Sequence, residues 1–209
     1  MVSVSTHPGI QKMEEKKDTS GLCKALTQDD PVIRREAALA LGRIRSTDAV
    51  IPLIAALSDP DQEVRQRAEE SLRKIRDGRA LEPLVAAMKN AEPRIRRIAA
   101  DLLGDLADTR ALDPLVFALR DRDEGTRVAI VEALGKIGGN RGLIPLVQAL
   151  KDESPSVREG AARALGRLGD PRSIEPLNEA AQSDAAQGVR RAAKRAQEII
   201  AAKTGMPEK

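Results

Sequence analysis

The amino-acid sequence predicts an all-α protein of the solenoid class, a right-handed superhelix of about six two-helix repeats of 31 residues. One observation is a row of arginines with a constant step of 31 residues: Arg34, Arg65, Arg96, Arg127 and Arg158. A second is a row of prolines with the same step: Pro52, Pro83, Pro114, Pro145 and Pro176. A fixed period of this length is typical of stacked helical units that bury one continuous core.

The composition fits thin, closely packed helical layers. The 209 residues are 41% hydrophobic with no Trp, no Tyr and one Phe, so alanine and leucine must fill the core. The 35 basic and 32 acidic residues give a net charge of +3, which indicates a mixed surface and not a nucleic-acid footprint. No apolar run is long enough for a membrane span, and the first 20 residues lack a secretory signal, so we expect a cytoplasmic protein.

The repeat period also sets the expected domain limits. Residues 1–17 lack apolar periodicity, and we expect them to form a flexible tail. The repeat solenoid should cover residues 18–201, and residues 202–209 should fray. The expected repeats lie near 18–45, 46–76, 77–107, 108–138, 139–169 and 170–201.

The first helix of each repeat, for example residues 113–120, should begin at the recurring proline. Proline suits a first helical turn because its missing N–H needs no partner there and its fixed φ fits the helix. Apolar residues at helical spacing then predict one buried face: Leu112, Leu115, Val116 and Leu119 in the fourth repeat.

The second helix of each repeat should begin after a capping residue four positions before the arginine: Asp30, Asp61, Asp123 or Ser154. Counted from the arginine, positions minus one, plus three, six, seven and ten form one apolar arc, which only Thr126 interrupts in the fourth repeat. Glycine near the end of this helix costs about 1 kcal/mol relative to alanine. We therefore expect a close approach there by the first helix of the next repeat, at Gly42, Gly104, Gly135 and Gly166.

The pattern LxxAL(K/R)D, followed by VR, AAxALG and a GD-x-R linker, resembles the HEAT-like repeats of phycobilisome lyases over residues 18–201. The resemblance implies second helices on a concave wall, and a ladder in which an aspartate six residues before the second-helix arginine pairs with it between repeats. The matching residues are Asp59 and Arg65, Asp121 and Arg127, Asp152 and Arg158, and Asp184 and Arg190. Gln28 and Asn90 replace the aspartate before Arg34 and Arg96, where the ladder should lack charge assistance.

Catalytic chemistry finds little support in the sequence. Deoxyhypusine hydroxylases resemble this pattern but hold two irons with His–Glu pairs, whereas His7 is the single histidine here, so we expect no metal. HEAT-like DNA glycosylases use aromatic side chains in a basic groove, and Phe117 is the only aromatic residue. Bilin lyases share these repeats, so a lyase-like or chaperone-like action on a chromoprotein is the alternative function. No catalytic residue and no cofactor is assigned.

Two further features have a structural and a functional interpretation. Cys23 occupies the position of Ile54 and Val85 in later repeats, so a half-buried packing thiol is favoured over a nucleophile. A row of linker arginines could contact a polyanion, but helix capping or pairing with linker aspartates is favoured. The arginines are Arg79, Arg110, Arg141 and Arg172, and the aspartates are Asp77, Asp108 and Asp170.

The face of the second helices opposite the apolar arc is the predicted binding surface for a protein partner. Ile98, Val128 and Ala129 are expected to form an exposed apolar centre within a charged rim. The predicted interface consists of Arg67, Glu70, Arg97, Ile98, Asp101, Val128, Ala129, Glu132 and Arg163. The predicted function is a monomeric, non-catalytic protein-interaction scaffold, with nucleic-acid binding as a less favoured reading.

Overall fold

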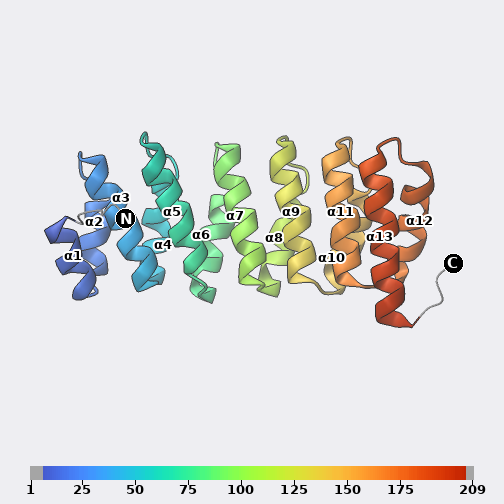
Figure 1. Ribbon diagram of the computed structural model, residues 1–209, viewed down its shortest axis with the longest axis horizontal. Coiled ribbons are helices and arrows are strands. Elements are labelled where there is room, and N and C mark those ends of the chain that lie inside the picture. The colour runs from blue at the N-terminus through green and yellow to red at the C-terminus, as the bar shows by residue number, and fades with distance from the viewer. Residues whose placement is uncertain (1–6, 206–209) are drawn as a thin grey trace, which may run out of the picture. The chain divides into compact units, whose positions relative to one another are not determined.

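The computed structural model describes residues 7–205, which form thirteen α-helices and no β-strand (Figure 1). The predicted all-α repeat fold is confirmed. None of the helices in this described range is both long and apolar enough to cross a membrane. The chain divides into two compact units, Met1–Ala87 and Met88–Lys209, which we call unit 1 and unit 2.

Unit 1 contains six α-helices. They are α1 (Pro8–Glu15), α2 (Thr19–Ala25), α3 (Pro31–Ile44), α4 (Val50–Ala56), α5 (Gln62–Lys74) and α6 (Leu81–Ala87). The first helix of each complete pair packs on the second, α2 on α3 and α4 on α5, and α3 lies alongside α5.

Unit 2 contains seven α-helices. They are α7 (Pro93–Leu106), α8 (Leu112–Ala118), α9 (Glu124–Ile137), α10 (Asn140–Ala149), α11 (Pro155–Leu168), α12 (Ile174–Ser183) and α13 (Gln187–Thr204). The longer helices α7, α9, α11 and α13 form one row, each in contact with the next, and α8, α10 and α12 pack against α9, α11 and α13 respectively.

The predicted capping residues begin the second helices. Asp30, Asp61 and Asp123 each accept a hydrogen bond from an N–H in the first turn of the following helix, at 2.8–3.0 Å. Ser154 does the same for α11. These bonds satisfy backbone donors that have no partner inside the helix.

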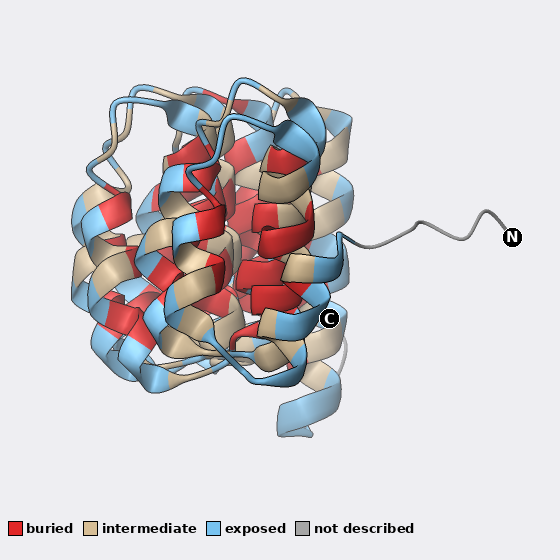
Figure 2. Ribbon diagram, turned by 90° about the vertical axis from the view of Figure 1, so that its left-hand side faces the viewer, coloured by how far each residue is buried: buried red, intermediate tan, exposed pale blue. Residues whose placement is uncertain are grey.

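The predicted apolar arc forms the core, and Figure 2 shows the buried residues on helix faces turned towards neighbouring helices. Ile130, Leu134 and Leu165 have no exposed surface in unit 2. Thr126 is equally buried, and its hydroxyl donates to Asp123 Oδ1 at 2.7 Å. The polar interruption in the arc is therefore satisfied by the residue that also caps the helix.

The recurring glycines allow a close approach, but by a different helix from the one predicted. A Cβ atom on Gly135 would lie 2.6 Å from Ala164 Cβ, and one on Gly104 would lie 2.8 Å from Ala133 Cα. Ala133 and Ala164 belong to α9 and α11, which are second helices. The expectation of a first-helix neighbour is therefore wrong, because the tight packing runs along the row of second helices.

The N-terminal tail was expected to be flexible, and this expectation is wrong for α1. Ile10 is 2% exposed because α1 packs on α2 and α3. The buried Glu36 carboxylate accepts a hydrogen bond from the His7 backbone N–H at 2.5 Å, and Glu14 pairs with Arg43 at 3.1 Å. At the other end α13 continues to Thr204, so residues 202–204 are helical. Residues 1–6 and 206–209 of the two predicted tails lie outside the described residues.

Candidate interaction surface

A ladder of arginines and aspartates joins consecutive second helices. Arg34, Arg96, Arg127 and Arg158 each donate from Nε and Nη2 to both oxygens of one aspartate carboxylate, at 2.7–3.0 Å. Their carboxylate partners are, in the same order, Asp59, Asp121, Asp152 and Asp184. This two-point geometry suits the planar guanidinium and holds the loop of each aspartate against the second helix of the preceding repeat.

The predicted pairing within the ladder is wrong by one repeat. The arginine six residues after each aspartate bonds to the carbonyl oxygen of that aspartate, as Arg127 Nη1 does to Asp121 O at 2.9 Å. The Asp121 carboxylate instead holds Arg96, in the preceding repeat. Arg65, Arg158 and Arg190 bond to carbonyls in the same way. The residue six positions before an arginine therefore supplies only a backbone carbonyl, and the charge partner of that arginine comes from the next repeat.

This register explains why Arg34 and Arg96 remain charge-assisted, contrary to the prediction. Gln28 and Asn90 supply only their backbone carbonyls, while Asp59 and Asp121 supply the carboxylates. The hydrogen bonds from Arg96 hold the pKa of Asp121 below its ordinary value.

Arg127 is the most enclosed of these four ladder arginines, with 7% of its side chain exposed. Its Nε and Nη2 bond to Asp152, Nη2 also bonds to Glu153, and Nη1 bonds to the carbonyls of Asp121 and Arg122. All five guanidinium N–H groups therefore have acceptors, which is the condition under which a buried arginine is tolerated.

The predicted binding face is narrower than expected, because Ile98 and Ala129 are only 3% and 4% exposed. Their position, two after the arginine, faces the neighbouring second helix. A Cβ atom on Gly160 at this position would lie 2.9 Å from Val131 Cγ2 in α9. The predicted exposed apolar centre is therefore wrong for Ile98 and Ala129. Val128, one position after the arginine, is partly exposed.

The remaining predicted interface residues are at least partly exposed. Arg67 and Glu70 belong to unit 1, where they form an ion pair of 2.9 Å. Arg97, Asp101, Val128, Glu132 and Arg163 belong to unit 2, on α7, α9 and α11. The structure thus brings the latter five onto one row of helices.

Ion pairs connect neighbouring helices on this row. Lys136 on α9 reaches Asp105 on α7 at 2.7 Å, and Arg163 on α11 lies 3.9 Å from Glu132 on α9. Within α11, Arg163 also pairs with Glu159 at 2.7 Å. These side chains keep 24–47% of their surface exposed to solvent, so each pair contributes little to stability. The result is a face of alternating charge with Val128 within it.

The linker arginines pair with nearby carboxylates. Arg79, Arg110 and Arg172 bond to the aspartate two residues earlier, at 2.9, 2.7 and 2.6 Å respectively. Arg141 lies 3.3 Å from Asp113. The favoured interpretation of pairing with linker aspartates is confirmed for the first three.

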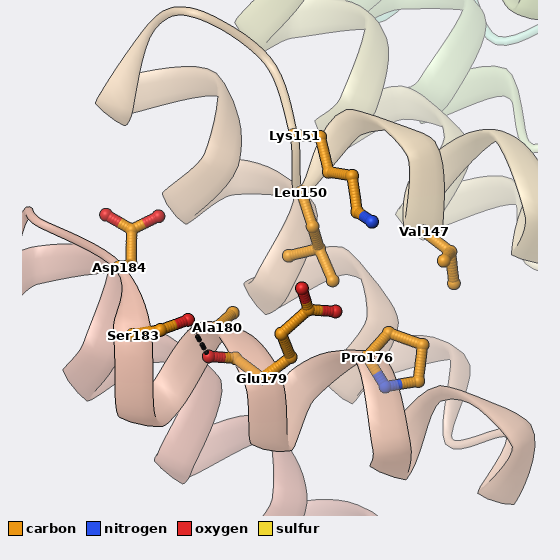
Figure 3. A pocket seen from close by; sticks show the side chains of 8 residues that line it. All are labelled: Val147, Leu150, Lys151, Pro176, Glu179, Ala180, Ser183 and Asp184. Carbon is orange, nitrogen blue, oxygen red and sulfur yellow. Dashed lines mark hydrogen bonds between the residues drawn. The ribbon is translucent and has the colours of Figure 1, made fainter.

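Neither the cysteine nor the groove between α10 and α12 supplies reactive chemistry. Burial, and then the charge of Asp48, raise the pKa of the half-buried Cys23 thiol, which keeps it in its poorly nucleophilic form. The groove in Figure 3 has a volume of about 90 Å³, well below the ~300–1,000 Å³ of typical small-molecule sites. Its charged side chains are Lys151, Glu179 and Asp184, and Ser183 Oγ donates to the Glu179 carbonyl. Among the described residues no group of three His, Cys, Asp or Glu side chains could hold a metal.

The sequence profile of HEAT repeats matches residues 19–101, 81–152 and 142–197. The chain belongs to the HEAT-repeat family. No curated protein sequence is similar enough to count as a relative.

Solved structures of other HEAT and related repeat proteins are similar to this one. The complex of CpcE and CpcF of phycocyanin lyase from Nostoc sp. PCC7120 shares 26% identity, with a TM-score of 0.57 over 83% of this chain and 74% of that one. An archaeal HEAT-like repeats protein from Thermococcus onnurineus NA1 shares 17% identity, with a TM-score of 0.57 over 96% and 94%. An engineered protein shares 23% identity, with a TM-score of 0.58 over 88% and 97%. These likenesses support a repeat scaffold of the HEAT and armadillo type.

Proposed function

We propose that this HEAT-repeat protein is a non-catalytic scaffold that binds a protein partner across the second helices of unit 2. The observation that carries the proposal is the row formed by α7, α9 and α11. Positions one, five and nine after each arginine lie on its solvent side, and none of them is fully buried. Repetition therefore gives an extended surface without any need for a deep pocket.

The centre of the proposed contact is Val128, flanked by Arg97 and Glu159 at the same position of the adjacent helices. Arg97 is exposed, and Val128 and Glu159 are partly exposed. Glu132 and Arg163 lie one helical turn further along α9 and α11. A partner that covers this strip would meet one apolar side chain within a polar rim, which is the usual layout of protein interfaces.

The test uses the full-length protein as bait in its native lysate, followed by affinity measurements with the purified partner. Because Ile98 is buried, the informative variant is Arg97→Glu combined with Val128→Glu. We expect this variant to melt like the parent chain and to lose affinity at least tenfold. The matched control is Phe117→Glu, at an 85% exposed residue on α8. Full affinity in the double variant would show that the partner binds elsewhere.

The similarity to the phycocyanin lyase complex supports one second candidate, a lyase-like or chaperone-like action on a chromoprotein. The absorption spectrum of protein purified from its native source tests this candidate. A visible band that follows the protein through gel filtration would favour it over the scaffold. A nucleic-acid partner, the less favoured reading, would appear in the same spectrum as excess absorbance at 260 nm.

A further inference from the structure

The last ladder arginine, Arg190, lies at the start of α13 in unit 2. Its Nη1 donates to the carbonyls of Asp184 and Ala185, at 2.6 and 2.9 Å. These are the same anchoring bonds that orient Arg127 and Arg158. The guanidinium of Arg190 is therefore held by the same two backbone contacts as the arginines that bind aspartate.

Arg190 differs from those arginines on its other edge. Nε and Nη2 of Arg34, Arg96, Arg127 and Arg158 hold an aspartate, whereas Nε and Nη2 of Arg190 bond to no carboxylate within residues 7–205. The Nε–H and Nη2–H groups of Arg190, which we call its fork, are oriented to bind both oxygens of a planar carboxylate.

Exposed basic side chains follow Arg190 on the same helix. Arg191 and Lys194 are exposed on the same helix, one and four residues further on. Arg195 is exposed as well, and it pairs with Glu198 at 2.9 Å. A negatively charged segment would therefore be attracted to the beginning of α13.

We propose that Arg190 and the basic face around it form a docking site for an acidic segment of a partner protein, in which an aspartate precedes a helix. The four internal sites show the form of the ligand. In all four, the aspartate Oδ1 that binds the arginine also accepts the N–H two residues further on, at 2.8–2.9 Å. An aspartate in the same tight turn would present both oxygens to Arg190.

A second copy of this chain fits α13 less well if its helices pack on α13 as the internal second helices pack on one another. Glu198 stands eight residues after Arg190, where Gly135 and Gly166 stand relative to their own arginines. Those glycines allow alanine backbones to approach closely, with Cβ-to-Cα separations of 2.8 and 2.9 Å. A glutamate side chain would keep another helix further away, so we assign the site to a loop or helix end and not to a stacked repeat.

The site lies on α13, outside the strip proposed for the scaffold partner, and its test does not depend on that partner. The probe is the capped peptide ALKDESPSV, which corresponds to residues 149–157 and contains the Asp152 turn. The full-length protein is titrated with it while the arginine Nε–H resonances are followed by NMR. We expect the Arg190 signal to shift saturably and the Arg158 signal, already bound to Asp184, to stay in place. A peptide with Asp152→Asn should bind at least about tenfold more weakly, because it lacks the charge-assisted bond.

The variant Arg190→Lys keeps the charge but lacks the fork, and it should lose the binding. Arg195→Lys, on the same helix, should retain it. If Arg190→Lys folds poorly, the affinities of the aspartate peptide and its Asp152→Asn form for the parent protein still test the proposal. An unmoved Arg190 signal, or equal binding of the aspartate and asparagine peptides, would overturn the proposal. Tighter binding of a short oligothymidylate, or concentration-dependent dimerisation that the peptide reverses, would overturn the assignment to an acidic protein segment.

Discussion

Replacing Arg127 with alanine should destabilise unit 2 by about 3 kcal/mol. Charge-assisted hydrogen bonds contribute about 1.5–3 kcal/mol each, and breaking a buried ion pair costs about 3–5 kcal/mol. The substitution removes both bonds to Asp152 and leaves the Asp121 carbonyl without its arginine donor. The Asp152 carboxylate is 16% exposed and keeps the Ser154 N–H as a donor, so the cost lies near the lower end of the buried-pair range.

The assay is thermal and urea unfolding followed by circular dichroism, with hydrogen exchange to locate the change in α9 and α11. For a chain of about 200 residues, 3 kcal/mol corresponds to a Tm lower by about 6–12 °C. Arg97→Ala is the matched control, because Arg97 is an exposed arginine on the same row of helices, and it should change stability by no more than about 0.5 kcal/mol. Equal effects of the two substitutions would refute the structural role of the ladder.

Three further predictions concern unit 2. Gly135→Ala should destabilise by about 1–3 kcal/mol despite its better helix propensity, because the new Cβ would lie 2.6 Å from Ala164 Cβ. The control is Gly125→Ala, whose Cβ would lie no closer than 3.4 Å to a side-chain atom and which should be neutral or stabilising in a urea titration. A larger loss of stability for Gly125→Ala than for Gly135→Ala would contradict the packing argument. Leu134→Ala should cost about 2–5 kcal/mol, and a loss below about 0.5 kcal/mol in that titration would place Leu134 outside the core. Since the folded-state pKa of Asp121 is depressed, the stabilisation by its carboxylate should be fully present above about pH 4 and be lost as the pH falls through the folded pKa. Asp121→Asn should therefore flatten the acid limb of a stability-versus-pH curve. An unchanged acid limb would contradict this role of Asp121.

The sequence was sufficient to predict the features that depend on local chemistry. The 31-residue period, the capping residues such as Asp123 and the buried arc around Leu134 all follow from helical geometry within one repeat. The pairing register of the ladder did not follow. An arginine such as Arg127 has an aspartate six residues before it and another 25 residues after it, and only the three-dimensional arrangement shows which carboxylate it holds.

The predicted binding face failed at Ile98 and Ala129 because a helical wheel describes one contact face. A second helix in a repeat array also has neighbouring second helices, which bury its flanks in addition to the face towards its own partner. The helix α1 was missed because its apolar pattern is short. Ile10 and Met13, three residues apart, are the signal that could have indicated it.

The offset of the ladder gives the chain a direction during synthesis. In the four repeats whose arginine holds an aspartate, the arginine leaves the ribosome before the aspartate that completes its bonding, which follows 25 or 26 residues later. A newly made repeat therefore reaches its full stability only when the next loop has emerged. Shortening the chain after the fifth repeat would leave Arg158 with its two carbonyl acceptors but without Asp184, whereas removing the first repeat would leave Asp59 with the Asp61 N–H but without Arg34. A truncation at either end therefore leaves one charged ladder residue without its partner, an aspartate at the N-terminal end and an arginine at the C-terminal end.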